Sequence, residues 1–174
     1  MCVVSQRAKV LGDGFERFSV YGFSIDYVRG SRVEFNPKSR EVEGDVAFHF
    51  PEKVKVFLSW GDLEKAAGFQ TVGNHVDHSL SKVKSAANVR NFEEISRTKI
   101  QIRSHEAVYT RARFDEIIVG LLSGRSRKPR EGHSVHLHCP KSERYFVVYG
   151  ILPKEGTYSY EETFQKMAKS LKCH

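Results

Sequence analysis

The chain has 174 residues, a formal net charge of +7, 40% hydrophobic residues and 28% charged residues. This length is enough for one domain with a substantial core, and we expect residues 1–174 to form a single domain. No run approaches the roughly 18 apolar residues that span a bilayer, so we expect no membrane partner. The first residues lack the hydrophobic stretch of a signal peptide, which predicts a cytoplasmic protein.

The net positive charge and the cysteines narrow the range of partners and sites that we expect. A basic chain favours acidic partners, namely nucleic acid, phosphate or an acidic protein surface. Cys2, Cys139 and Cys173 stand at unrelated spacings that match neither a zinc-ligand pattern nor a disulfide framework. We interpret them as incidental reduced thiols. Asn and Gln together number only eight while Lys, Arg and Glu are abundant, which leans toward a thermophile.

The N-terminal third of the chain is predicted to be mostly β-strand. Residues 1–14 are expected to form a mobile or edge segment, closed by the turn signal Asp13-Gly14. Alternating apolar residues and turn signals predict strands at residues 15–27 (with a break at Gly22), 32–36, 45–50 and 53–60. Trp60 ends the last of these strands and is expected in the core.

Helices are predicted in three places. Residues 61–68 form a short helix at best. Residues 74–88 form a clearer one, capped by Asn74 or Asp77, with an apolar stripe at Val76, Leu80, Val83 and Ala87. The last helix starts at Ser159, whose capping-box partner is Glu162. Its apolar stripe, which should dock on the sheet, consists of Tyr160, Phe164, Met167, Ala168 and Leu171.

Residues 95–114 alternate with a period of two on either side of a turn at Ser104-His105, which predicts a hairpin. Cross-strand neighbours share one face of an antiparallel pair. The hairpin is therefore expected to gather one basic stripe, made of Lys99, Arg103, Tyr109, Arg111 and Arg113. Such a face with an aromatic ring could stack a nucleic-acid base, unless a helix or acidic neighbours cover it.

A second basic segment follows the hairpin. Residues 120–132 contain three glycines and are predicted to form a long, mobile, basic loop. Its positive charges, which would contact an acidic surface or phosphates, are Arg125, Arg127, Lys128 and Arg130. The alternative is that this loop is a solvated hairpin tip without a binding role.

Tyr145 to Ile151 contains no charged residue. A strand that is apolar on both faces belongs in the middle of a sheet covered on both sides. The predicted fold is therefore α+β: a twisted antiparallel sheet of six or more strands with helices on both faces.

His133, His136, His138 and Cys139 form the only ligand-like cluster of the sequence. On a predicted strand His136 and His138 lie on one face, about 7 Å apart from a rise of ~3.3 Å per residue. They would need a third metal ligand from His75, Asp77 or His78. Exposed structural histidines are the alternative. Cys139 and His138 point to opposite faces and cannot form a catalytic dyad. No nucleotide or cofactor motif is found, so no cofactor is expected.

Three stretches resemble one known family. Tyr21–Tyr27 is similar to the "G-F-hydrophobic" opening strand of the PsbP-like superfamily, and Ile102–Ala107 resembles its hairpin, with His105 in place of a glycine. The end of the chain, Tyr160–Lys172, resembles its C-terminal helix. The superfamily includes the photosystem II subunit PsbP, the DcrB lipoproteins and a Ran-binding nuclear import factor. The resemblance implies a sheet between helices and a binding or assembly role without shared catalytic residues.

These observations predict a non-enzymatic, cytoplasmic interaction domain that binds an acidic protein partner through the basic segments. The alternative is a nucleic-acid-binding protein that uses the same charges. A third hypothesis is a metal-dependent enzyme built around His136 and His138. An exposed apolar patch beside the charges would favour the protein partner.

Overall fold

The computed structural model describes residues 14–51, 54–65, 69–120, 124–153 and 160–174. The strands of this part of the chain are β1 (Phe15–Val20), β2 (Phe23–Val28), β3 (Arg32–Phe35), β4 (Gly44–His49), β5 (Lys55–Asp62), β6 (Val89–Ile102), β7 (His105–Gly120), β8 (Gly124–Cys139) and β9 (Arg144–Leu152). The helices are α1 (Val72–Ser85), the short 3-10 helix η1 (Pro140–Ser142) and α2 (Tyr160–Lys169). The predicted segment 1–14 lies outside the described residues except for Gly14.

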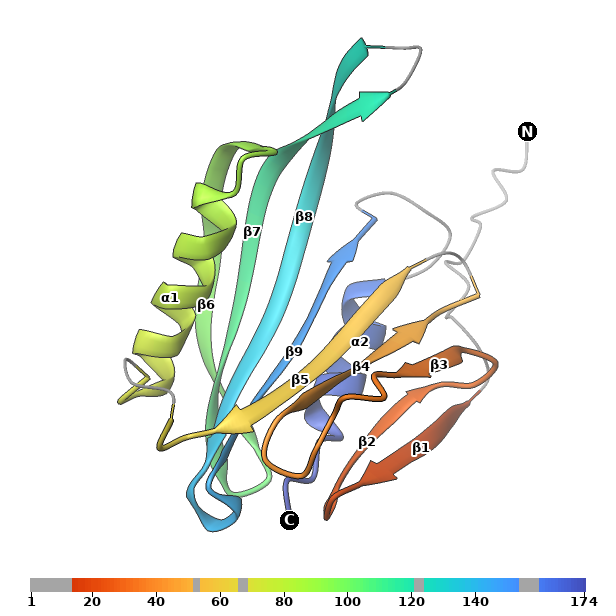
Figure 1. The fold of residues 1–174 in the computed structure, drawn as a ribbon, viewed down its shortest axis with the longest axis vertical. Coiled ribbons are helices and arrows are strands. Elements are labelled where there is room, and N and C mark those ends of the chain that lie inside the picture. The colour runs from red at the N-terminus through yellow and green to blue at the C-terminus, as the bar shows by residue number, and fades with distance from the viewer. Residues whose placement is uncertain (1–13, 52–53, 66–68, 121–123, 154–159) are drawn as a thin grey trace, which may run out of the picture.

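Seven strands form one antiparallel sheet in the order β3-β4-β5-β9-β8-β7-β6, and β1 and β2 form a separate hairpin (Figure 1). The uncharged segment 145–151 lies in β9, the fourth of the seven strands. The prediction that this segment occupies the middle of the sheet is confirmed. The segment lacks charged residues because both faces of a central strand are covered or flanked by apolar neighbours.

The two α-helices, α1 and α2, lie on opposite faces of the sheet, as Figure 1 shows. α2 and the β1–β2 hairpin cover the face that carries Leu58, Phe146 and Val148, and these side chains share one core cluster with Trp60. α1 covers the other face over β6, β7 and β8. The predicted α+β fold with helices on both faces is confirmed. The predicted stripe of α2 is buried throughout: Tyr160, Phe164, Met167, Ala168 and Leu171.

α1 spans Val72–Ser85 and not the predicted residues 74–88, so it both begins and ends earlier. It begins earlier, because Thr71 is the N-cap and its hydroxyl accepts a hydrogen bond from the backbone N–H of Asn74 at 3.1 Å. Val76 is fully buried, but Val83 is 36% exposed. The second half of the apolar stripe is therefore not closed against the sheet. The short helix at 61–68 is not found in the described residues, since β5 runs to Asp62 and residues 63–65 form a turn.

Candidate interaction surface

Residues 120–132 are predicted to form a loop. This prediction is wrong for residues 124–132, which form the first half of β8. Main-chain pairing with β7 overrides the polar, loop-like composition. Beyond Glu116 β7 loses its partner β6, and before Glu131 β8 has no pairing with β9. Residues 124–130 of β8 thus pair only with residues 114–120 of β7, and these two stretches form a two-stranded projection, the basic arm, at the top of Figure 1.

The cations of the basic arm fall into two groups. Arg130 is tied to the arm, because its Nε donates to Glu116 Oε2 at 2.8 Å. Within the described ranges no carboxylate lies at ion-pair distance from the three others, Arg125, Arg127 and Lys128, which are exposed. Three unneutralised cations on one projection attract an anionic partner.

The arm also carries aliphatic side chains among its cations. The register places Ile117 opposite Arg127 and Val119 opposite Arg125, so these four side chains share a face. Val119 is 73% exposed. This face walls a cleft of about 470 Å³, the arginine cleft, whose described lining is Ala87, Asn88, Arg90, Ile117, Val119, Arg125, Ser126 and Arg127. Its surface combines three guanidinium groups with two aliphatic side chains.

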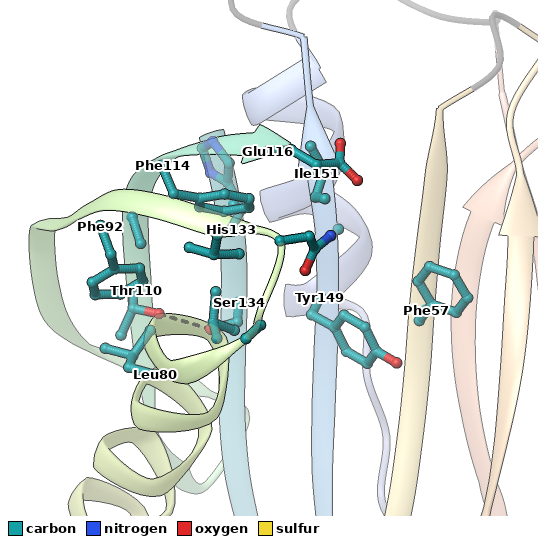
Figure 2. A pocket seen from close by; sticks show the side chains of 17 residues that line it. Phe57, Leu80, Phe92, Thr110, Phe114, Glu116, His133, Ser134, Tyr149 and Ile151 are labelled. Carbon is teal, nitrogen blue, oxygen red and sulfur yellow. Dashed lines mark hydrogen bonds between the residues drawn. The ribbon is translucent and has the colours of Figure 1, made fainter. Parts of the chain in front are cut away.

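An apolar groove adjoins the arginine cleft, and Asn88 lines both. The groove has a volume of about 350 Å³ and lies where the second half of α1 stands away from β7, β8 and β9 (Figure 2). Leu80 and Val83 form its α1 side, and Tyr149 and Ile151 form its β9 side. Tyr149 stacks on Phe57 with ring centroids 5.1 Å apart. Thr110 and Ser134 satisfy each other at 2.7 Å on its floor, which leaves the lining mostly apolar.

The predicted basic stripe on the hairpin is wrong as a single surface. Arg103 and Ser104 make the turn, with φ of 53° at Arg103, so that Ile102 pairs with His105. A two-residue turn pairs odd-numbered with even-numbered positions. Lys99 therefore lies opposite Val108, on the other face from Tyr109, and forms an ion pair with Glu106 at 3.3 Å.

Tyr109 is not available for stacking a base, because α2 covers it and it is only 8% exposed. Its hydroxyl lies 2.6 Å from His133 Nδ1 and 3.2 Å from Glu161 Oε1 on α2. Burial and the Glu161 carboxylate raise the pKa of Tyr109. Arg111 is also engaged, with Nη2 2.6 Å from Glu131 Oε1.

Glu131 accepts from Arg111 and lies 3.1 Å from His133 Nε2. Tyr109, Arg111, Glu131, His133 and Glu161 thus form one polar network beneath α2. Burial lowers the pKa of His133. Arg113 remains exposed. The five stripe residues are thus distributed over a turn, two faces and a buried network, and they form no joint binding surface.

His136 and His138 lie beneath α1, and His75 joins them from the helix. His75 Nδ1 is 3.2 Å from His138 Nε2, and the ring centroids of His75 and His136 are 4.8 Å apart. The nitrogens do not converge on one point, because His136 Nε2 faces Ser79 Oγ at 3.1 Å. Burial lowers the pKa of His75 to about 3 and that of His136 to about 4, which leaves neutral, packed imidazoles.

The interpretation of the cysteines as incidental thiols did not anticipate their placement. Cys139 and Cys173 are buried and meet at one end of the sheet with His105 and His174. In the described part of the chain this is the only group of three or more His, Cys, Asp or Glu residues whose ligand atoms lie together. No local spacing signals it, because the four residues come from three separate segments.

Comparison by sequence finds no relative: no known family profile and no curated protein matches the chain. Comparison by structure does. The solution structure of cyanobacterial PsbP (CyanoP) from Synechocystis sp. PCC 6803 superposes with a TM-score of 0.65 at 11% identity, over 100% of this chain and 98% of that one. The fold is PsbP-like.

A crystal structure from Bacteroides thetaiotaomicron VPI-5482 also superposes on this chain, with a TM-score of 0.54 at 15% identity. The match covers 95% of this chain and 49% of the other, so the chain spans about half of that relative. The predicted resemblance is thereby confirmed at the level of fold. In the described residues, no helix has the length and apolar character that a membrane crossing needs.

Proposed function

We propose that this PsbP-like chain is a non-enzymatic interaction domain that binds an acidic, partly apolar segment of a partner protein. The arginine cleft would receive the acidic side chains, and the adjoining apolar groove would receive the apolar ones. One observation carries the proposal: Arg90, Arg125 and Arg127 line a cleft together with Ile117 and Val119, and none of the three has an ion-pair partner among the described residues. Guanidinium groups bind carboxylates in a fixed, bidentate geometry.

The apolar surface favours a protein over a nucleic acid as the partner. Phosphate contacts need cations alone, whereas exposed apolar patches rimmed by polar residues mark protein interfaces. The apolar groove meets this description, with Ile151 44% and Tyr149 39% exposed. The aromatic platform that would stack bases is also missing from the predicted place, since Tyr109 is buried.

The lining of the arginine cleft supports binding rather than catalysis. Its described residues include no carboxylate, histidine or cysteine that would act as a general base or a nucleophile. Ser126 offers a hydroxyl without a base beside it in that lining. A cytoplasmic location stays a prediction.

The test is a fluorescence anisotropy titration with a short peptide of alternating glutamate and leucine. Probes of similar length are an all-glutamate peptide and single-stranded DNA and RNA. The triple variant R125A/R127A/K128A is compared with K82A/K84A/K169A, which removes the same charge from exposed helix positions. We expect the mixed peptide to bind best, and only the arm variant to weaken it, by about tenfold or more, or ~1.4 kcal/mol.

Two results would overturn the proposal. If nucleic acid binds more tightly than the mixed peptide, with a steep salt dependence that the arm variant reduces, the alternative function takes its place. If both variants weaken the peptide equally, the attraction comes from net charge and not from the arginine cleft.

A further inference from the structure

Four side chains with metal-binding atoms converge at the end of the sheet opposite the basic arm. They are His105, Cys139, Cys173 and His174, and their ligand atoms all lie within 4.8 Å of one another. Cys139 is fully buried and Cys173 is 3% exposed, whereas His174 is exposed. In Figure 1 the β6–β7 turn, the β8–β9 connection and the C-terminus reach this same end.

The fold places each donor independently of any ligand. Ala107 pairs with Leu137, and two more residues along this register bring His105 opposite Cys139. The segment after α2 is fixed by an isolated bridge, in which Ser24 and Lys172 exchange two backbone hydrogen bonds of 2.8 Å. Cys173 follows directly and faces the end of the sheet. The donors are therefore held by sheet pairing and not by the flexibility of one loop.

The distances match one tetrahedral site. Cys173 Sγ lies 3.3 Å from His105 Nε2 and 3.3 Å from His174 Nδ1. Cys139 Sγ lies 3.4 Å from His174 Nδ1 and 3.9 Å from His105 Nε2. A tetrahedral zinc ion with Zn–S of about 2.3 Å and Zn–N of about 2.05 Å separates its sulfur and nitrogen ligands by about 3.6 Å. The four measured separations lie on both sides of that value.

We propose that His105, Cys139, Cys173 and His174 bind one zinc-class divalent cation. Two sulfurs and two imidazole nitrogens are the ligand set of closed, structural zinc sites, and calcium or magnesium would require oxygen ligands. Binding releases the two thiol protons to solvent, and the two thiolates then neutralise the 2+ charge. This site is separate from the basic arm and does not depend on the proposed function.

The four protein ligands leave no open position for water, so the cation acts on structure. It would tie the segment after α2 to the ends of β7 and β8. This joins the last element of the chain to the hairpins at one end of the sheet. The alternatives are thiol–imidazole hydrogen bonds without a metal, and a redox pair in which Cys139 and Cys173 oxidise to a disulfide; both cysteines are free thiols in this structure.

The test is a metal titration of the reduced, chelator-treated full chain with Zn²⁺ and Co²⁺. Cys2, which lies outside the described residues, is changed to serine throughout so that only two thiols remain. We expect one equivalent of Co²⁺ to give the thiolate charge-transfer band and the visible bands of a tetrahedral centre. One equivalent of Zn²⁺ should displace it and protect both thiols from a thiol reagent.

Variants locate the ligands. C139S/C173S should abolish the thiolate band, and H174A should weaken metal affinity at least tenfold. Because His174 is exposed, H174A should fold normally, which circular dichroism will check. H75Q/H136Q, in the imidazole cluster beneath α1, is the matched control and should bind normally.

Three results would overturn the proposal. The first is no stoichiometric metal binding by the reduced chain. The second is binding that survives C139S/C173S or is lost in H75Q/H136Q, which would place the metal elsewhere. The third is a disulfide that forms between the two thiols in the presence of one equivalent of Zn²⁺ and a mild oxidant, since a bound cation should block it.

Discussion

The sulfur of Cys139 lies 3.4 Å from Nδ1 of His174, although 35 residues separate the two in the chain. The contact brings the last residue of β8 against the segment that follows α2, on the far side of the β8–β9 connection. A cation held there would link the segment after α2 to the ends of β7 and β8.

Zinc should stabilise the folded chain. A ligand that binds only the folded state adds about 2.7 kcal/mol to the unfolding free energy when its free concentration is 100-fold above Kd. We expect a higher Tm with zinc than with chelator for the wild type. C173S should have the same Tm in both conditions, and a zinc-dependent rise in that variant would contradict the site.

The polar network under α2 should contribute measurably to stability. Tyr109→Phe removes the hydroxyl that lies between His133 and Glu161, so we expect the unfolding free energy to fall by about 1 to 2 kcal/mol. Urea denaturation measures it. Tyr149→Phe, which keeps the ring contact with Phe57 in the half-exposed groove, should change it by less than ~0.5 kcal/mol. Equal effects in both variants would contradict the network.

Acid should destabilise the chain through the imidazoles beneath α1. Burial lowers the pKa of His136 to about 4 and that of His75 to about 3, while both titrate near 6.5 when unfolded. Below that pH the unfolded state binds more protons, so the unfolding free energy falls as the pH drops and is level above it. Between about pH 4 and pH 6.5, His136 alone should make the unfolding free energy change by about 1.4 kcal/mol per pH unit.

Denaturation in urea at a series of pH values checks this slope. His136→Gln keeps a hydrogen-bonding group near Ser79 but does not titrate, so its slope should be shallower. An unchanged slope would show that other groups, such as carboxylates, account for the acid sensitivity.

The apolar groove should contribute to peptide affinity and not to stability. Ile151→Ser removes an aliphatic side chain from the groove rim, and we expect the affinity for the mixed peptide to fall by roughly 3- to 10-fold, as for ~1 kcal/mol of apolar burial. Val42→Ser is the matched control, because Val42 has the same 44% exposure but lies away from the groove. If the two variants bind alike, the groove is not part of the interface.

Much of the fold could be predicted from local patterns. The uncharged segment in β9 indicated a central strand, because burial on both faces selects a continuous apolar run. The apolar stripe of α2 indicated its buried face, because burial on one face selects a periodic pattern. The basic arm was missed for the opposite reason. Residues 124–130 have the composition of a loop, and only pairing with residues 114–120 of β7 makes them a strand.

The site residues depended on register and long-range contacts. The number of residues in the turn decides which side of the sheet Lys99 faces: the two-residue turn at Arg103 and Ser104 puts it on the other face from Tyr109, and a pattern with a period of two does not fix the length of a turn. The Cys139–Cys173 cluster needs three segments to meet. Their spacing along the chain carries no signal of that meeting, which is why the thiols read as incidental.

The most direct test of the proposed interaction surface is an NMR titration of the isotope-labelled chain with the mixed glutamate and leucine peptide. We predict that backbone amide shifts concentrate on the basic arm, around Arg125 and Arg127, and on the groove residues Tyr149 and Ile151. The surface around Lys99 and Arg103 should stay unchanged. Shifts that spread evenly over the exposed cations, or that leave the arm and the groove unaffected, would contradict the account.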